Sequence, residues 1–223
     1  MVVAVASLGS SFSGERAAVA IALPGLTIER PVVREAREEA PAHERAAWAE
    51  ALRPLVFSNV KTGAASTARL YAADGSVDPV EALAIDRVLA EKDAEARPLD
   101  RRVLQLVIKA AAHFGAGEVV VVSSWRDSAR PGSQHRRGAA IDFMLPGVPP
   151  LKLAAYLRSG ARVGVGVYTH KLTQFVHLDS REASYHWADA SPPGRWWRES
   201  RMTDWGAKAR DAAYEPAQDL PEH

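Results

Sequence analysis

The alternation of apolar and polar positions predicts two consecutive helices in the first half of the chain. Asp78 is placed as an N-cap before Pro79, and an apolar stripe follows on one helical face. A second helical pattern starts at Asp100 and continues to Phe114, where Gly115 suits a left-handed C-cap. We interpret both stripes as core-forming, because apolar residues at this spacing pack against a neighbouring layer.

Shorter apolar runs predict β-strands on both sides of these helices. Residues 55–60 and 64–71 predict a hairpin, and four consecutive valines within residues 118–123 predict a strand that is buried on both faces. Further strands are expected at residues 139–143, 162–168, 174–178 and 185–187, with one helix at residues 150–159. This order of elements predicts an α+β fold.

The pattern also divides the chain into three expected parts. Residues 1–53 are interpreted as an N-terminal leader or helical arm, residues 54–190 as the folded domain, and residues 191–223 as a C-terminal tail that is partly disordered. The chain starts with a short apolar run, but no Lys or Arg precedes it, so an export signal stays open. No run approaches the roughly 20 apolar residues of a membrane span, and stable membrane insertion is not expected.

The amino-acid composition restricts the possible chemistry of the protein more than it restricts the possible folds. Hydrophobic residues make up 47% and charged residues 25% of the 223 residues, as in ordinary globular proteins. With a net charge of +1, the protein has no strong positive field that would attract nucleic acid, so nucleic acid is not an expected partner. The chain has no cysteine, so any metal must use His, Asp or Glu ligands. We expect a monomer.

One short stretch combines two possible metal ligands. His135 and Asp142 stand seven residues apart, within Ser-Gln-His-Arg-Arg-Gly-Ala-Ala-Ile-Asp at residues 133–142. A third ligand, His177, is offered by Phe-Val-His-Leu-Asp at residues 175–179. Two histidines and one carboxylate with an open fourth position are a ligand set of hydrolytic zinc, which lowers the pKa of a bound water to about 7.

These two motifs together resemble those of the zinc D-Ala-D-Ala peptidases, which have the hedgehog/DD-peptidase fold. Within that group the sequence is most similar to the bacterial murein endopeptidases, over residues 55–190. The resemblance implies a small antiparallel sheet with helices packed on it, and Zn²⁺ held by His135, Asp142 and His177. It also implies that Arg126 holds a substrate carboxylate or the developing oxyanion. The alternative for Arg126 is a structural ion pair with Asp127 or Asp142.

The general base is the weak point of the resemblance. Many members of the group carry Asp or Glu three residues before the last ligand histidine, but this chain has Gln174 there. Asp179 is our candidate, because side chains two residues apart on a strand share one face. It would act either as the base or as a partner that orients a ligand histidine. His186 and His170 are weaker candidates.

The resemblance implies a zinc metallopeptidase that hydrolyses peptide crosslinks or stem peptides of bacterial peptidoglycan. Peptidoglycan peptides are then its partners, and a periplasmic or extracellular location follows from that substrate. The alternative function is a catalytically silent, zinc-containing module that binds the cell wall or its peptides, which Gln174 favours. The sequence leaves open whether the enzyme is a murein endopeptidase or a carboxypeptidase, and whether it cleaves a D,D or an L,D bond.

Overall fold

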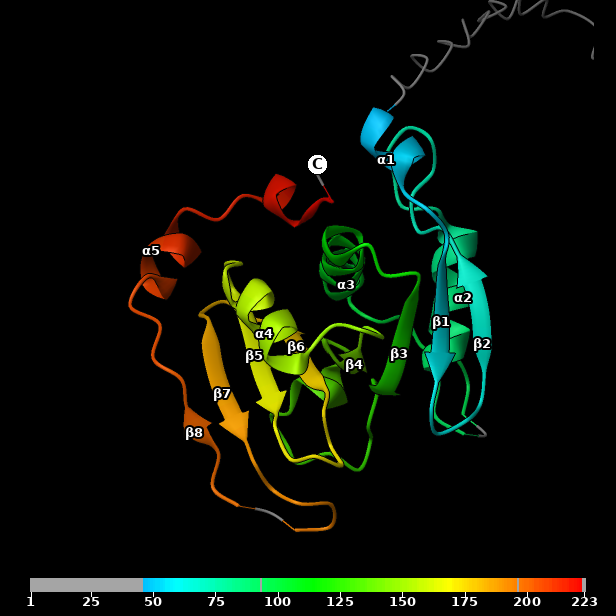
Figure 1. Cartoon of the computed structure of the whole chain (residues 1–223). Coiled ribbons are helices and arrows are strands. Elements are labelled where there is room, and N and C mark those ends of the chain that lie inside the picture. Colours follow the sequence, from blue (N-terminus) through cyan, green and yellow to red (C-terminus); the bar gives the residue numbers. More distant parts are fainter. Residues whose placement is uncertain (1–45, 93, 196, 222–223) are drawn as a thin grey trace, which may run out of the picture. The chain divides into compact units, whose positions relative to one another are not determined.

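The computed structural model describes residues 46–92, 94–195 and 197–221 (Figure 1). Most of the expected leader, residues 1–45, lies outside the described residues, and the division of the chain into three parts stays a prediction. Within the described residues, no helix has the length and apolar character needed to span a bilayer.

Eight strands form one sheet, in the order β2-β1-β3-β4-β6-β5-β7-β8. The strands are β1 (Leu55–Asn59), β2 (Ala65–Ala68), β3 (Glu118–Ser123), β4 (Ala140–Met144), β5 (Val163–Tyr168), β6 (Val176–Ser180), β7 (Tyr185–Asp189) and β8 (Ser200–Arg201). The helices are α1 (Ala47–Ala51), α2 (Pro79–Leu89), α3 (Arg101–Phe114), α4 (Pro150–Arg158) and α5 (Ala207–Ala212), with short 3-10 turns η1 (Gln134–Arg137) and η2 (Pro216–Asp219). The predicted α+β class is confirmed.

The sheet is larger than the small antiparallel sheet expected, and it is mixed. β1 pairs in parallel with β3, and β5 pairs in parallel with β7. A parallel pair needs a long crossover connection, and α2 and α3 supply it between β1 and β3. The sequence pattern located these strands but not their neighbours.

The predicted helix boundaries follow from local capping. The Asp78 side chain accepts hydrogen bonds from the backbone of Val80 and Glu81 at the start of α2. Asp100 caps α3 in the same way, and Gly115 ends it with a φ of 63°. The N-cap and C-cap signals in the sequence therefore predicted both helices.

The central strands separate the core from a polar face. Side chains alternate along a strand, so Val163, Val165 and Val167 of β5 share one face and join the buried hydrophobic core. Helices α3 and α4 pack against β6, and α4 also packs against β5 (Figure 1). The other face of the same strands carries the buried polar residues Asp142, His177 and Asp179.

The chain beyond Asp189, where the apolar pattern fades, forms β8, α5 and η2. Strand β8 pairs with β7, and η2 contacts α3. Asp211 of α5 accepts hydrogen bonds from Arg162 and Ser184. This segment is thus bonded to the elements that surround the start of β5.

Candidate metal centre

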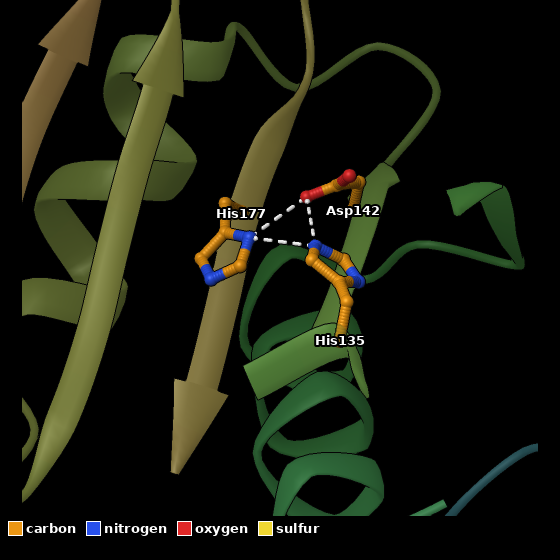
Figure 2. Close-up of side chains that lie close together, drawn as sticks. All are labelled: His135, Asp142 and His177. Carbon is orange, nitrogen blue, oxygen red and sulfur yellow. Dashed lines mark hydrogen bonds and ion pairs between the residues drawn. The ribbon is translucent and has the colours of Figure 1, made fainter. Parts of the chain in front are cut away.

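Three buried side chains from η1, β4 and β6 converge on the polar face of the sheet (Figure 2). His177 Nδ1 lies 2.8 Å from Asp142 Oδ1, and His135 Nε2 lies 3.2 Å from the same oxygen. The two histidine nitrogens are 3.1 Å apart. The structure therefore brings together the three ligands predicted from the sequence.

Strand register and one turn place these side chains. Asp142 and His177 are direct partners across β4 and β6, so their side chains lie side by side on one face. His135 reaches them from η1, which ends at Gly138 with a φ of 67°. A Cβ at Gly138 would overlap the Trp125 ring, so only glycine fits this turn.

The outer hydrogen bonds of the two histidines set which ring nitrogens face the centre. His135 Nδ1 donates to the backbone oxygen of Ser124 at 2.5 Å, and His177 Nε2 donates to Asp179 at 2.8 Å. When both rings are neutral, each then presents an unprotonated nitrogen to the oxygen of Asp142. Three acceptor atoms thus meet without a fixed donor among them, and such a set fits a metal cation.

The electrostatics of the centre agree with a cation site. Burial opposes protonation of His177, but its hydrogen bonds to Asp142 and Asp179 outweigh burial and raise its pKa to about 9. Burial also opposes ionisation of Asp142, yet hydrogen bonds from His135 and His177 hold its pKa well below the ordinary range. The two carboxylates around His177 thus favour a positive charge at this point, and a metal ion bound to the ring would take the place of its proton.

Asp179 lies on the edge of the His177 ring that faces away from the other two ligands. Its carboxylate accepts from His177 Nε2 through one oxygen and from Arg181 through both oxygens, with Arg181 Nε at 2.6 Å. The residue is fully buried. Asp179 thus contacts a ligand rather than the space that the three ligand atoms share.

Arg126 lies at the rim of the centre. Its side chain is 38% exposed, and its Nη2 is 3.9 Å from Asp142 Oδ2. Asp127, the other expected ion-pair partner, instead forms two hydrogen bonds with Arg97, at 3.0 and 3.1 Å. Of the two structural pairs considered for Arg126, only the long one to Asp142 is present.

A cavity of about 750 Å³ opens over this face, with His135, His177 and Arg126 in its wall. Gln174 is not among the residues that line it and instead lines a neighbouring cavity of about 710 Å³. Gln174, which stands where similar proteins commonly have an acidic residue, therefore does not line the cavity beside the proposed ligands.

Alternating glycines on β5 leave room for side chains that pack beside the centre. Gly166 is the register partner of both His177 and Trp187, and a Cβ there would overlap the Trp187 ring. A Cβ at Gly164 would overlap the ion pair between Asp179 and Arg181. The sequence analysis missed this signal, although Val-Gly-Val-Gly-Val-Tyr shows it directly: one face of β5 carries valines, the other glycines.

Other residues of the cavity were also missed, while two histidines considered earlier lie elsewhere. Tyr168 and Glu199 line the cavity, and neither belongs to the two motifs. His186 neighbours Tyr185 and Trp187 on β7, so it faces the opposite side of the strand and is buried near Asp204. His170 accepts a hydrogen bond from the backbone of Leu172 and is not part of the cluster.

An α+β domain with a buried His-Asp-His cluster on one face of its sheet is compatible with the fold of the DD-peptidases and offers a possible metal site. A family model described as peptidoglycan L,D-endopeptidase MepK matches residues 47–187, and the chain belongs to this family. The probable peptidoglycan L,D-endopeptidase MepK of Haemophilus influenzae is 25% identical over 143 residues, which cover 57% of this chain and 75% of the relative. No solved structure matches the chain.

Proposed function

We propose that this protein is a zinc-dependent peptidase that hydrolyses peptide bonds in bacterial peptidoglycan, and that it acts as an L,D-endopeptidase. The observation that carries the proposal is the convergence of three buried acceptor atoms from His135, Asp142 and His177 beside an open cavity. Membership of the endopeptidase family supports the substrate and the bond. A bound Zn²⁺ would activate a water molecule and polarise the scissile carbonyl.

We assign Arg126 to the oxygen atoms of the substrate. Its guanidinium lies at the rim of the cavity, only 3.9 Å from Asp142, and its Nε has no hydrogen-bond partner among the described residues. Unused donors of a guanidinium suit a carboxylate or an oxygen that gains negative charge during the reaction. Arg126 therefore orients the peptide and stabilises developing charge.

We assign Asp179 to positioning His177 rather than to proton transfer from water. Its hydrogen bonds to His177 and Arg181 occupy both carboxylate oxygens. A carboxylate that accepts from the outer nitrogen of a ligand histidine fixes the ring and raises its basicity. This is the orienting role of the two considered for Asp179 from the sequence.

Two further proposals follow from the substrate and the family. The protein would act outside the cytoplasm, in the periplasm or the extracellular space, because its substrate lies there. It would act as a monomer, since all proposed ligands come from a single chain.

Metal analysis combined with muropeptide digestion tests the proposal. The purified protein should contain about one Zn²⁺ per chain and cleave muropeptide dimers that are crosslinked through an L,D bond, in preference to dimers with a D,D crosslink. A chelator should abolish cleavage, and added Zn²⁺ should restore it. His135→Ala should lose both metal and activity, whereas His113→Ala, at an exposed position on α3, should keep both.

Each contrary outcome has a definite meaning. Protein without bound metal that cleaves dimers despite the chelator would refute the metal centre. Bound Zn²⁺ without cleavage of any muropeptide would favour a silent binding module over an enzyme. Cleavage of only the D,D crosslink would keep the peptidase and refute the proposed bond specificity.

A further inference from the structure

Tyr168 is held rigidly beside the proposed metal centre. It ends β5, and its backbone N–H donates to the oxygen of Phe175 at 3.0 Å. Its ring stacks on the Phe175 ring, with the centroids 4.1 Å apart and the planes at 25°. Because Gly166 pairs with His177, and Tyr168 is two residues further along the same strand, the Tyr168 side chain rises from the same face of the sheet as His177.

The hydroxyl of Tyr168 lies among the charges of the centre. Tyr168 lines the ligand cavity together with His135, His177 and Arg126. Burial raises the pKa of its hydroxyl, and the Asp142 carboxylate adds to the rise. Burial therefore favours the neutral, protonated form of the hydroxyl. Burial and nearby charges account for this rise in pKa without a hydrogen bond, so the proton of the hydroxyl is available to a ligand.

Tyr168 also separates the ligand cavity from a second, less polar one. The second cavity of about 710 Å³ is formed mainly by the segment at residues 144–151, with Tyr168, Thr169 and Gln174 on its other side. No other residue in the described part of the chain lines both cavities. A peptide that extends from one cavity into the other would therefore pass the Tyr168 side chain.

We propose that Tyr168 is a catalytic residue, whose hydroxyl donates a hydrogen bond to the carbonyl oxygen of the scissile peptide as that oxygen becomes negative. Arg126, on the wall of the same cavity, is the second donor. No proton is transferred in this role, because Tyr168 remains protonated while the charge on the substrate oxygen grows and declines. This inference rests on the proposed peptidase function and adds a residue to it.

Tyr168→Phe tests the donor directly, because it removes one oxygen and keeps the ring that stacks on Phe175. The expected result is a fall of roughly 100-fold in kcat, in the range seen when a single oxyanion donor is lost, with KM within about threefold of wild type. Zinc content and melting temperature should be unchanged. Tyr156→Phe, on α4, is the matched control and should keep wild-type kcat.

Binding of a transition-state analogue separates this role from simple packing. A peptide phosphinate that mimics the tetrahedral state should bind Tyr168→Phe more weakly by about the same factor as the fall in kcat/KM. An uncleavable substrate analogue with a planar amide should bind both proteins almost equally.

Several results would overturn the inference. If Tyr168→Phe keeps the wild-type kcat, the role of Tyr168 is refuted and the proposed function stands. The same holds if the variant differs from wild type only in KM or only in its zinc content. Lack of any peptidase activity in the wild-type protein would instead refute the proposed function itself.

Discussion

At the scale of single residues, the outer nitrogens of the two histidines organise the site. His135 is fixed by a backbone oxygen and His177 by a carboxylate, so the two ligand rings are held with different strength. A backbone oxygen cannot be removed by substitution, whereas Asp179 can. The contribution of the outer hydrogen bonds is therefore best tested at Asp179.

Asp179→Asn should weaken zinc binding by about 10- to 100-fold, the usual effect of losing a partner of a ligand histidine. The amide still accepts a hydrogen bond from His177 but loses its charge and its ion pair with Arg181. Excess Zn²⁺ should then restore most turnover, as measured by titration of activity against metal. Glu182→Gln, whose side chain is 94% exposed, provides the control. Turnover that stays lost with zinc fully bound would point instead to proton transfer by Asp179.

His186 should make stability depend on pH. Burial and the nearby Arg158 lower its pKa to about 4, against an ordinary value of 6.5. Between pH 6.5 and 4, His186 is therefore protonated in the unfolded chain but not in the folded protein. The free energy of unfolding is highest above about pH 6.5 and falls as the pH is lowered towards 4. The expected loss is on the order of 3 kcal/mol.

Chemical denaturation of wild type and His186→Leu from pH 7.5 to 4 measures this effect. Both ring nitrogens of His186 lack hydrogen bonds within the described part of the chain, so leucine breaks none there. The variant should lose less stability than wild type over this range. Parallel curves would show that His186 does not contribute to the pH dependence.

The sequence predicted the three proposed ligands but not their surroundings. Spacing and resemblance sufficed for His135, Asp142 and His177, because the motif fixes which residue types stand together. Strand alternation also placed Asp179 on the face of His177, but it could not reveal which ring nitrogen each carboxylate contacts. Arg181, two residues beyond Asp179, shares the same face and is the signal that would have suggested an ion pair.

At the scale of elements, local signals predicted the helices and long-range pairing decided the sheet. The caps of α2 and α3 depend on a few adjacent residues, so they are readable from the chain. The parallel neighbour of β1 is β3, almost sixty residues later, and no local pattern encodes that partner. The glycines of β5 are understood only once β6 and β7 are known to flank it.

Gly166→Ala should damage the site more than the fold. The added methyl group overlaps the Trp187 ring, which must shift, and the ring lies beside His177 with centroids 4.9 Å apart. We expect roughly 1–3 kcal/mol of destabilisation and a larger relative loss of peptidase activity. Gly117→Ala, where a methyl group meets nothing within 4 Å, should change neither. Equal activity for Gly166→Ala and wild type would show that the close packing of Trp187 on Gly166 has no role in activity.

At the scale of the whole molecule, the chain after β8 is joined to the domain by charged and polar contacts. Arg102 of α3 bonds to Asp219 at 2.7 Å and also to the backbone oxygens of Ala161 and Arg162. The Asp211 carboxylate accepts hydrogen bonds from the backbone N–H groups of Arg162 and Ser184, which directly precede β5 and β7. These contacts connect α3, the starts of two site-bearing strands and the last helix of the described chain.

Asp211→Ala should therefore destabilise the domain by about 2 kcal/mol, since it leaves two backbone donors without their acceptor. Thermal unfolding should show a lower melting temperature, and kcat per folded molecule should stay near wild type because the site itself is untouched. Asp127→Ala, which removes an exposed pair with Arg97, should shift the melting temperature much less. An unchanged melting temperature for Asp211→Ala would mean that the final segment adds little to stability.

The glycine face of β5 has a consequence for any attempt to redesign the enzyme. The Trp187 ring and the Asp179–Arg181 pair cover this face, so a side chain at Gly164 or Gly166 would displace groups beside His177, and the valines of the same strand are fixed by the core. Variation must therefore come from the walls, such as Arg130 on the loop after β3 and Glu199 before β8. A library confined to such wall positions should yield folded proteins with altered selectivity, whereas one that includes β5 should yield mostly inactive ones.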